Sequence, residues 1–330
     1  MTAAYDVAAI GNAIVDVIAP ATDAFLADQS LAKGPMTLID DARAVALYDA
    51  MAPGVETSGG SAGNTIAGVA SLGGRGAYVG KVASDQLGEV FSHDLKALGV
   101  AFDTPYLDCG PATARCLINV TPDGQRTMAT YLGAANQLTP EDVDPDLIGA
   151  CAITYLEGYL FDPPLARAAF EKAAAAARAA GRRVSITLSD VFVVDRWRAE
   201  LLAFMTASVD VLFANEAELK ALYQTDDFDQ ALAAVRSTVE IAAVTRSEHG
   251  SILTQGARTV TVPAYPVERV LDTTGAGDQY AAGVLLGLAR GYELERCGRL
   301  GSLAAAEVIA HYGPRPQVSL ETLARDHGLL

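Results

Sequence analysis

The chain has 330 residues, 51% of them hydrophobic, which is enough for one large α/β domain with a small appendage or for two domains. Its formal net charge of −16 argues against sequence-independent binding to nucleic acid and against attachment to an anionic membrane surface, because both need a basic face. Any phosphate site must therefore be built locally, from backbone amides, a few basic side chains and a divalent cation.

The sequence shows neither targeting signals nor metal-ligand motifs. No window of about 18 apolar residues predicts a transmembrane helix, and the first residues lack the basic region of a signal peptide. The few cysteines form no CxxC pair, which favours free buried thiols in a reducing cytoplasm. They are Cys109, Cys116, Cys151 and Cys297. The histidines lack HxxxH or HExxH spacing, so we expect a cytoplasmic protein without a zinc site.

The first strand candidate leads directly into two polar side chains. Residues 5–10 form a short apolar run, and Asn12 and Asp16 follow its end. Open α/β sheets bind ligands beyond the carboxyl ends of their strands, so both side chains are candidate ligand contacts. Turn formation would explain Asn12 equally well, and Asp16 could be a solvated carboxylate.

A glycine-rich stretch precedes an amphipathic run. Residues 35–39 could form a strand and residues 41–51 a helix, and the sequence SGGSAGN then begins at Ser58. It contains G-x-S-x-G, the nucleophile elbow of α/β hydrolases, with Ser61 at the serine position. That motif needs a strand directly before it, and residues 52–57 make a poor one. A serine hydrolase is therefore disfavoured.

From Arg115 to Tyr131 the sequence pattern switches to a period of two. Two strand candidates flank Pro122, Asp123 and Gly124, which give a strong hairpin turn signal. A hairpin among βα units cannot easily join a parallel sheet, so we predict that it projects as a small β-sheet lid that excludes water. Arg126 at the start of the second strand is either a solvated charge or a clamp on a transferring phosphate.

Regular alternation of strands and helices follows Pro140, which predicts a mainly parallel sheet. The predicted strands are residues 152–156, 184–188, 209–213 and 241–245, and the predicted helices are residues 165–180, 196–206 and 215–223. Asn215 and Glu218 are one helical turn apart at the ligand edge of this sheet and face the same way. An N-cap followed by a first-turn carboxylate would give the same pattern.

The stretch DTTGAGDQYAAG from Asp272 combines a strand end, a glycine turn and a helix start. We read residues 267–271 as the end of a strand, and apolar residues recur at helical spacing from Ala281. Glycines permit positive φ, and the first amides of a helix lack internal acceptors, so residues 275–277 are a candidate anion site. Asp278 either caps the helix or takes a proton from an attacking hydroxyl, which points to phosphoryl transfer. The sequence contains neither a Walker A motif nor GxGxxG.

Residues 272–278 resemble the signature D-T-x-G-A-G-D of the ribokinase-like (PfkB) carbohydrate and nucleoside kinases. Residues 59–64 are similar to the G-G-x-x-x-N part of the family's N-terminal signature, and the resemblance covers nearly the whole chain. It implies a three-layer α/β/α fold with a mainly parallel sheet, formed by a single domain over residues 1–330. A small β-sheet lid formed by about residues 15–40 and 112–135 would be inserted in that domain.

The resemblance also implies roles for matching positions of this sequence. In the family, the amides of Gly275, Ala276 and Gly277 would hold the transferring phosphate, Asp278 would be the base and Arg126 a phosphate clamp. The implied substrate contacts are Asn12, Asp16, Gly59, Gly60, Ser61, Asn64, Met128, Thr130, Leu132 and Thr274. The implied nucleotide contacts are Asn215, Glu218, Thr245, Gly250, Ser302, Ala305 and Ala306, with Glu218 holding Mg²⁺ through water. Ser247 departs from the family, which commonly has glycine there.

Two stretches are similar to the adenosine kinase branch of the family: GNAIVD from Gly11 and RTMATYLGAAN from Arg126. In that branch an aspartate at the position of Asp16 accepts bonds from two neighbouring sugar hydroxyls. The resemblance implies phosphorylation of the 5′-hydroxyl of adenosine by ATP, with Mg²⁺ and, as an open option, a monovalent cation such as K⁺. A ribokinase- or fructokinase-like sugar kinase and a catalytically idle ligand-binding relative are the alternatives. The substrate would be a small nucleoside or sugar, and a monomer and a homodimer both fit.

Overall fold

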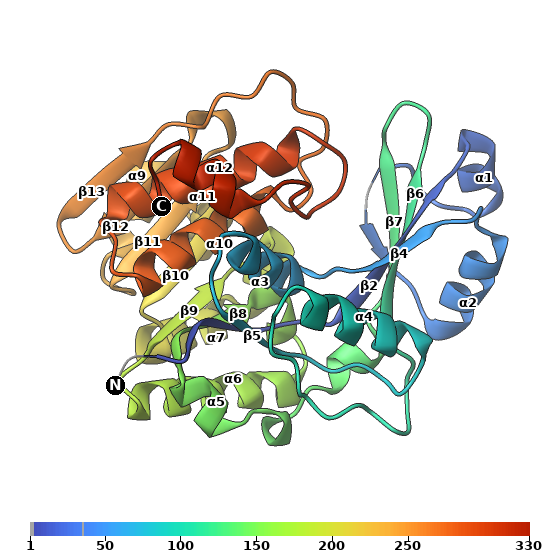
Figure 1. Cartoon of the computed structure of the whole chain (residues 1–330), viewed down its shortest axis with the longest axis horizontal. Helices are drawn as coiled ribbons and strands as arrows, with labels where there is room; N and C mark the ends of the chain where they lie inside the picture. Colours follow the sequence, from blue (N-terminus) through green and yellow to red (C-terminus); the bar gives the residue numbers. More distant parts are fainter. Residues whose placement is uncertain (1–2, 35) are drawn as a thin grey trace.

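The computed structural model describes residues 3–34 and 36–330, which form two β-sheets (Figure 1). The larger sheet has the strand order β13-β12-β11-β10-β9-β8-β1-β5. Its strands are β1 (Tyr5–Ile10), β5 (Gly76–Val79), β8 (Cys151–Glu157), β9 (Arg183–Thr187), β10 (Val211–Asn215), β11 (Ile241–Thr245), β12 (Ser251–Gln255) and β13 (Arg258–Val262). The neighbours from β5 to β11 pair in parallel, whereas β12 and β13 are antiparallel additions at one edge.

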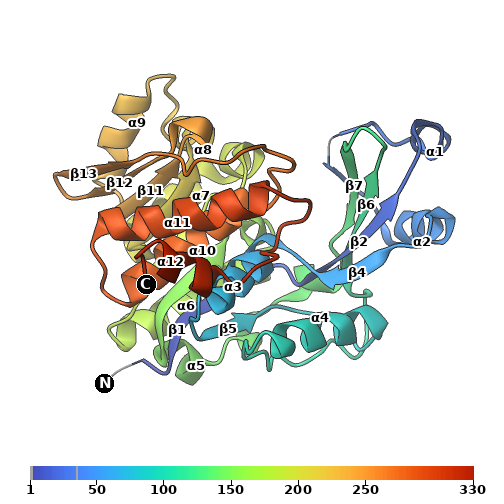
Figure 2. The same ribbon diagram turned by 45° about the horizontal axis from the view of Figure 1, so that its top comes forward.

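Helices cover both faces of the larger sheet (Figure 1 and Figure 2). One layer contains α3 (Ser61–Ser71), α4 (Gln86–Ala97), α10 (Ala276–Ala289), α11 (Leu294–Ile309) and α12 (Leu320–Asp326). The other contains α5 (Pro145–Gly149), α6 (Pro164–Ala179), α7 (Val191–Ser208), α8 (Glu216–Tyr223) and α9 (Phe228–Val235). Strand β1 is apolar throughout its buried part because Val7 and Ala9 face the first layer, while Ala8 and Ile10 face the second.

The smaller sheet projects from one end of the larger one (Figure 2). Its order is β3-β7-β6-β2-β4, with β2 (Ile14–Pro20), β3 (Met36–Leu38), β4 (Val55–Ser58), β6 (Ala114–Val120) and β7 (Arg126–Tyr131). Helices α1 (Asp23–Asp28) and α2 (Asp41–Ala50) lie on its far side, where Leu47 packs against Val17, Leu117 and Ala129. Side chains alternate along a strand, so Asp16, Cys116 and the even-numbered residues of β7 face the other way, towards α10.

The predicted fold class is confirmed: a ribokinase-like α/β fold with a mostly parallel central sheet, helices on both sides and a second small sheet. Other details of the sequence-based prediction were wrong. Residues 267–271 are a loop and not a strand. Residues 52–57 were predicted to make a poor strand, but β4 covers residues 55–58. Asp16 follows the end of β1, as predicted, and lies inside β2 of the smaller sheet. The strand predicted over residues 35–39 is β3, and Pro35 lies outside the described residues.

The remaining sequence expectations concern cysteines and membrane helices. All four cysteines are free; three are buried, but Cys109 is exposed, contrary to expectation. In the described part of the chain, every helix is too short or too polar to cross a bilayer.

Close contact between α3 and α10 explains why Gly68 has no side chain. A Cβ there would overlap Gln279 Oε1 and lie 2.8 Å from Ala282 Cβ. We expect Gly68→Ala to destabilise the protein by about 1–3 kcal/mol, because a packed interface cannot absorb another methyl group without strain. Gly149→Ala is the matched control, since its Cβ would make an ordinary 3.4 Å contact with Ala180. Urea unfolding of the two variants measures the difference, and equal midpoints would contradict the prediction.

Candidate active site

The turn that precedes α10 has the geometry expected of an anion site. Gly275 is the N-cap of α10 with φ of 79°, and a Cβ there would lie 2.7 Å from Pro314 Cα. Asp272 holds the turn closed: its Oδ1 accepts from Thr274 N at 3.0 Å and from Thr274 Oγ1 at 2.7 Å. Ala276 N donates to the Thr273 carbonyl at 3.2 Å, whereas Gly277 and Asp278, whose amides lack intrahelical acceptors, line the adjoining cavity.

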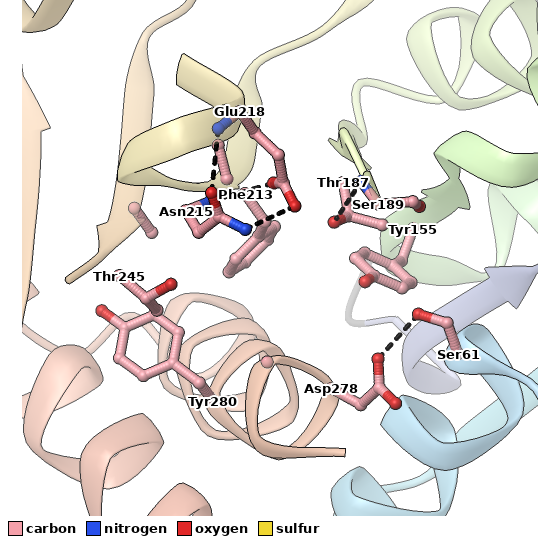
Figure 3. A pocket seen from close by; sticks show the side chains of 13 residues that line it. Ser61, Tyr155, Thr187, Ser189, Phe213, Asn215, Glu218, Thr245, Asp278 and Tyr280 are labelled. Carbon is pink, nitrogen blue, oxygen red and sulfur yellow. Dashed lines mark hydrogen bonds between the residues drawn. The ribbon is translucent and has the colours of Figure 1, made fainter. Parts of the chain in front are cut away.

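Asp278 lies at the centre of the site and does not cap its own helix. Its Oδ1 accepts a hydrogen bond from Ser61 Oγ at 2.7 Å (Figure 3). Its Oδ2 accepts one from Asn64 Nδ2 at 3.1 Å. Burial raises the pKa of Asp278 to about 6, while the two hydrogen bonds and the charge of Arg315 oppose the increase. A carboxylate with this pKa is ionised at neutral pH and still accepts a proton readily.

Two neighbouring cavities meet at Gly277. The first, of about 120 Å³, extends from Asp278 and Ser61 to Asn215 and Glu218 (Figure 3). The second, of about 540 Å³, contains the other predicted nucleotide contacts, which are Thr245, Gly250, Ser302, Ala305 and Ala306. Gly277, Thr245 and Tyr280 line both cavities, so the glycine turn borders the place where the two cavities adjoin.

Asn215 and Glu218 form a capping box at the start of α8. Glu218 N donates to Asn215 Oδ1 at 2.8 Å, and Asn215 N donates back to Glu218 Oε2 at 2.9 Å. Asn215 Nδ2 also donates to Glu218 Oε1 at 2.7 Å. Burial raises the pKa of Glu218 to about 7. The capping interpretation is thus correct, and both carboxylate oxygens have protein partners although Glu218 lines the cavity.

The smaller sheet contributes a second carboxylate, Asp16, to the site. Burial raises its pKa to about 7, and the charges of Arg315 and Arg126 oppose the shift. Gly59 permits the strand end to approach, because a Cβ on Gly59 would overlap the carboxylate of Asp16. Gly60, the N-cap of α3, has φ of 78° and packs against the carbonyl of Asn12. Within the described residues Asp16 accepts no hydrogen bond, so both its oxygens can accept one from a ligand.

Comparison with known proteins agrees with this geometry. The model of the pfkB family of carbohydrate kinases matches residues 43–322. Adenosine kinase from Saccharomyces cerevisiae is 30% identical over 329 residues, which cover 92% of this chain and 95% of the yeast protein. The structure of adenosine kinase from Sinorhizobium meliloti is similar with a TM-score of 0.91 and 56% identity, over 98% of this chain and 99% of that one. A probable sugar kinase from Rhizobium etli CFN 42 has a TM-score of 0.92 and 50% identity, over 99% and 100% of the two chains.

The chain belongs to the pfkB family of carbohydrate kinases. It is a phosphotransferase that acts on an alcohol group.

In this pfkB kinase Arg126 links the smaller sheet to the glycine turn. Its Nη2 forms an ion pair with Asp272 Oδ2 at 2.7 Å, and both side chains are less than one-tenth exposed. The other donors of Arg126, Nε and Nη1, are buried without a hydrogen-bond partner among the described residues. The expected phosphate clamp therefore already has one carboxylate partner and keeps two donors for a ligand.

The other predicted lid contacts lie on or just after β7. Met128 and Thr130 share the face of Arg126, and Leu132 directly follows the strand. Thr130 Oγ1 donates to Cys116 Sγ at 3.2 Å, so this hydroxyl has a protein partner.

The kinase does not have a hydrolase site at Ser61, although the reason differs from the one the sequence offered. A strand, β4, does precede Ser61, as a nucleophile elbow requires. However, the Ser61 hydroxyl donates to Asp278, and none of the four histidines of the chain contacts it. A serine nucleophile needs such a base beside it.

Glu157 and Arg315 belong to the site, but the sequence analysis missed both. Glu157 ends β8 and is 1% exposed; its Oε1 accepts from Asn12 Nδ2 at 2.7 Å, and its Oε2 accepts from Ala62 N at 2.9 Å. Asn12 is therefore held by Glu157, whose pKa burial raises to about 7. An acidic residue at the end of an apolar strand was the available signal for Glu157. Arg315 lies in the sequence Gly-Pro-Arg-Pro at residues 313–316, for which the sequence analysis predicted no site residue.

Proposed function

We propose that this kinase transfers the γ-phosphoryl group of ATP to the 5′-hydroxyl of adenosine. The observation that carries the proposal is a pair of carboxylates in one site: Asp278 beside the glycine turn, and Asp16 on the smaller sheet without a protein hydrogen bond. The first suits a base for a hydroxyl, and the second suits a ribose diol. The similarity to proteins named adenosine kinase at 56% and 30% identity supports the choice of adenosine.

The proposed residues have distinct roles in the transfer. The 5′-oxygen attacks the γ-phosphorus, the bond to the β–γ bridging oxygen breaks, and ADP leaves while Asp278 accepts the hydroxyl proton. The amides of residues 275–277 and the free donors of Arg126 stabilise the charge on the phosphoryl oxygens. Asp16 orients the ribose through its two hydroxyls. The smaller sheet, with its face towards α10, acts as the lid that keeps water from competing as acceptor.

The residues at the site also fit the Mg²⁺ expected with ATP. The described residues contain no group of three or more histidine, cysteine, aspartate or glutamate side chains placed to hold a metal. Mg²⁺ keeps several waters and binds phosphate oxygens, so it needs few protein ligands. Glu218, which lines the cavity with both oxygens in the capping box, would contact the ion through water. The ion would supply charge neutralisation at the phosphates. The monovalent cation, the cytoplasmic location and the oligomeric state stay predictions.

A substrate panel tests the proposal: adenosine, inosine, guanosine, 2′-deoxyadenosine, ribose and fructose, each with ATP. We expect adenosine to have the highest kcat/KM, and 2′-deoxyadenosine to lose about 10-fold because one hydrogen bond to a charged group is missing. Asp16→Asn should lower kcat/KM for adenosine and reduce the discrimination between the two nucleosides, since the amide presents only one acceptor oxygen to the diol.

Turnover of free sugars with adenosine ignored would support the runner-up, a sugar kinase. The specific observation in favour of that alternative is the 50% identity to a probable sugar kinase. Asp278 would remain the base in that case, but the adenosine proposal would be wrong.

A further inference from the structure

The segment that follows α11 packs behind the active site. Gln279 Nε2 donates to the carbonyl oxygens of both Pro314 and Asn64, at 3.0 Å each, and thereby ties this segment to α3. Gly275 packs directly against Pro314, where a Cβ would lie 2.7 Å from Pro314 Cα. These contacts fix the position of the next residue, Arg315.

The guanidinium of Arg315 lies in a chain of hydrogen bonds. Arg315 Nε donates to Asn64 Oδ1 at 3.3 Å, and Nη1 donates to Ser58 Oγ at 2.7 Å. Ser58 is held in turn by Asp94, whose Oδ2 accepts from Ser58 N at 2.8 Å. The chain of contacts therefore runs from Asp94 through Ser58 and Arg315 to Asn64.

Arg315 determines which way the amide of Asn64 faces. A guanidinium can only donate hydrogen bonds, so the amide oxygen of Asn64 must face Arg315 and its NH₂ group must face away. On that side lies Asp278, whose Oδ2 accepts from Asn64 Nδ2 at 3.1 Å. In the reversed amide, oxygen would oppose the carboxylate and NH₂ would oppose the guanidinium, and both contacts would be repulsive.

We infer that Arg315 is a positioning residue for phosphoryl transfer: it fixes the amide of Asn64 so that this amide donates to Asp278 and holds the base in place. The inference rests on the proposed role of Asp278. Asn64, which the sequence predicts as a substrate contact, would then also hold the carboxylate of Asp278 through its hydrogen bond.

Arg315 also brings positive charge into an acidic environment. The titratable groups that interact with Asp278 are Asp16 on β2, Tyr155 and Glu157 on β8, and Tyr159 on η3 (Gly158–Phe161). Arg315 is the cation whose charge lowers the pKa of Asp278. Its removal should raise that pKa, so that the base becomes ionised only at higher pH.

The first test compares Arg315→Met with Arg315→Lys by steady-state kinetics over a range of pH. We expect Arg315→Met to lower kcat by up to about 10²-fold, because the base is no longer held in position. The acidic limb of the profile of kcat against pH should move to higher pH in Arg315→Met, while the KM for ATP should change little. Arg315→Lys keeps a donor and the charge, and should recover most of the kcat and the native limb. An acidic limb that does not move in Arg315→Met would overturn the inference.

The second test asks whether Arg315 acts through Asn64. Asn64→Ala should lower kcat, and the addition of Arg315→Met should then lower it little further, because both changes break the same contact. Losses that multiply in the double variant would contradict the inference. Arg290→Met is the control: Arg290 Nη2 donates to the Gly73 carbonyl at 2.7 Å and ties α10 to the turn after α3, away from the site. It should leave kcat and its pH dependence unchanged.

Two further variants, Arg315→Gln and Asp278→Asn, complete the tests of the role of Arg315. If Arg315→Met does not fold, Arg315→Gln replaces it, because a glutamine can face either orientation of the Asn64 amide. If the acidic limbs of the kcat–pH profiles of Arg315→Gln and Arg315→Lys then lay at the same pH, the inference would be overturned. Asp278→Asn distinguishes a failure of the proposed base from a failure of the positioning role of Arg315. Full turnover by that variant would refute the base itself, whereas an inactive Asp278→Asn beside unaltered Arg315 variants would refute only the positioning role.

Discussion

Asp278→Asn is expected to lower kcat by about 10²–10⁴-fold, the range that a positioned general base contributes. The asparagine is nearly isosteric, so Ser61 and the start of α10 keep their places, but an amide cannot accept the hydroxyl proton. Steady-state and single-turnover kinetics measure the loss. Calorimetric titration with adenosine and with a non-hydrolysable ATP analogue should show binding that is retained, because the substitution removes a negative charge and no binding surface.

The matched control for this variant is Asp227→Asn. Asp227 also stands at a helix start, where its Oδ1 accepts from the amides of Asp229 and Gln230, and asparagine caps helices as well as aspartate does. Its activity should equal that of the unchanged protein. A kinase that retained more than a small part of its turnover in Asp278→Asn would not use this carboxylate as base. If the protein without substitutions bound both adenosine and the ATP analogue but showed no turnover, the alternative of a catalytically idle ligand-binding relative would be correct.

The local parts of the site could be predicted from the sequence because their residues are neighbours in the chain. Residues 272–278 contain the whole turn, and Asn215 with Glu218 forms a capping box within one helical turn. The failed strand at residues 267–271 has a physical explanation. Val267 and Val270 line the larger of the two cavities, and Val270 is 51% exposed, so their apolar side chains border a cavity and do not face the core. A pattern of apolar residues does not distinguish these two environments.

Contacts between distant parts of the chain could not be predicted in this way. The hydrogen bond between Arg315 and Asn64 joins residues 251 positions apart in the sequence, and the one between Ala62 and Glu157 joins residues 95 positions apart. A short sequence motif includes only neighbouring residues, so it cannot indicate either contact. Strand β4 exists only because Val55 to Ser58 pair with β2, since its own sequence includes no strong strand pattern. Long-range pairing overrode local preference there. The hydrogen bonds to Asp278 from α3 therefore depend on the fold, whereas Asp278 itself, the proposed base, could be found in the local motif.

Alanine substitutions of Gly275 and Gly277 in the anion turn are expected to have different effects. Gly275→Ala should lower the stability of the fold, whereas Gly277→Ala should lower activity by interfering with the ligand. Gly275 has φ of 79° and lies against Pro314, so Gly275→Ala should destabilise the protein by about 1–3 kcal/mol. Gly277 has no positive φ, and a Cβ there would meet no atom within 4 Å. Gly277→Ala should therefore fold normally and gain up to about 1 kcal/mol from helix propensity.

Within the described residues nothing packs against a Cβ at position 277, so we predict that the glycine is needed by a ligand that passes over it. Gly277 lines both cavities at the point where they meet, and a methyl group there would occupy the space of a phosphate bound to the turn amides. We expect Gly277→Ala to lower kcat/KM for ATP by about 10²–10³-fold, comparable to the loss of one donor from an oxyanion hole. Thermal unfolding and steady-state kinetics of both variants decide the matter. If Gly277→Ala is as active as the unchanged kinase, the phosphate does not bind at this turn, and the donors of Arg126 become the principal phosphate contacts.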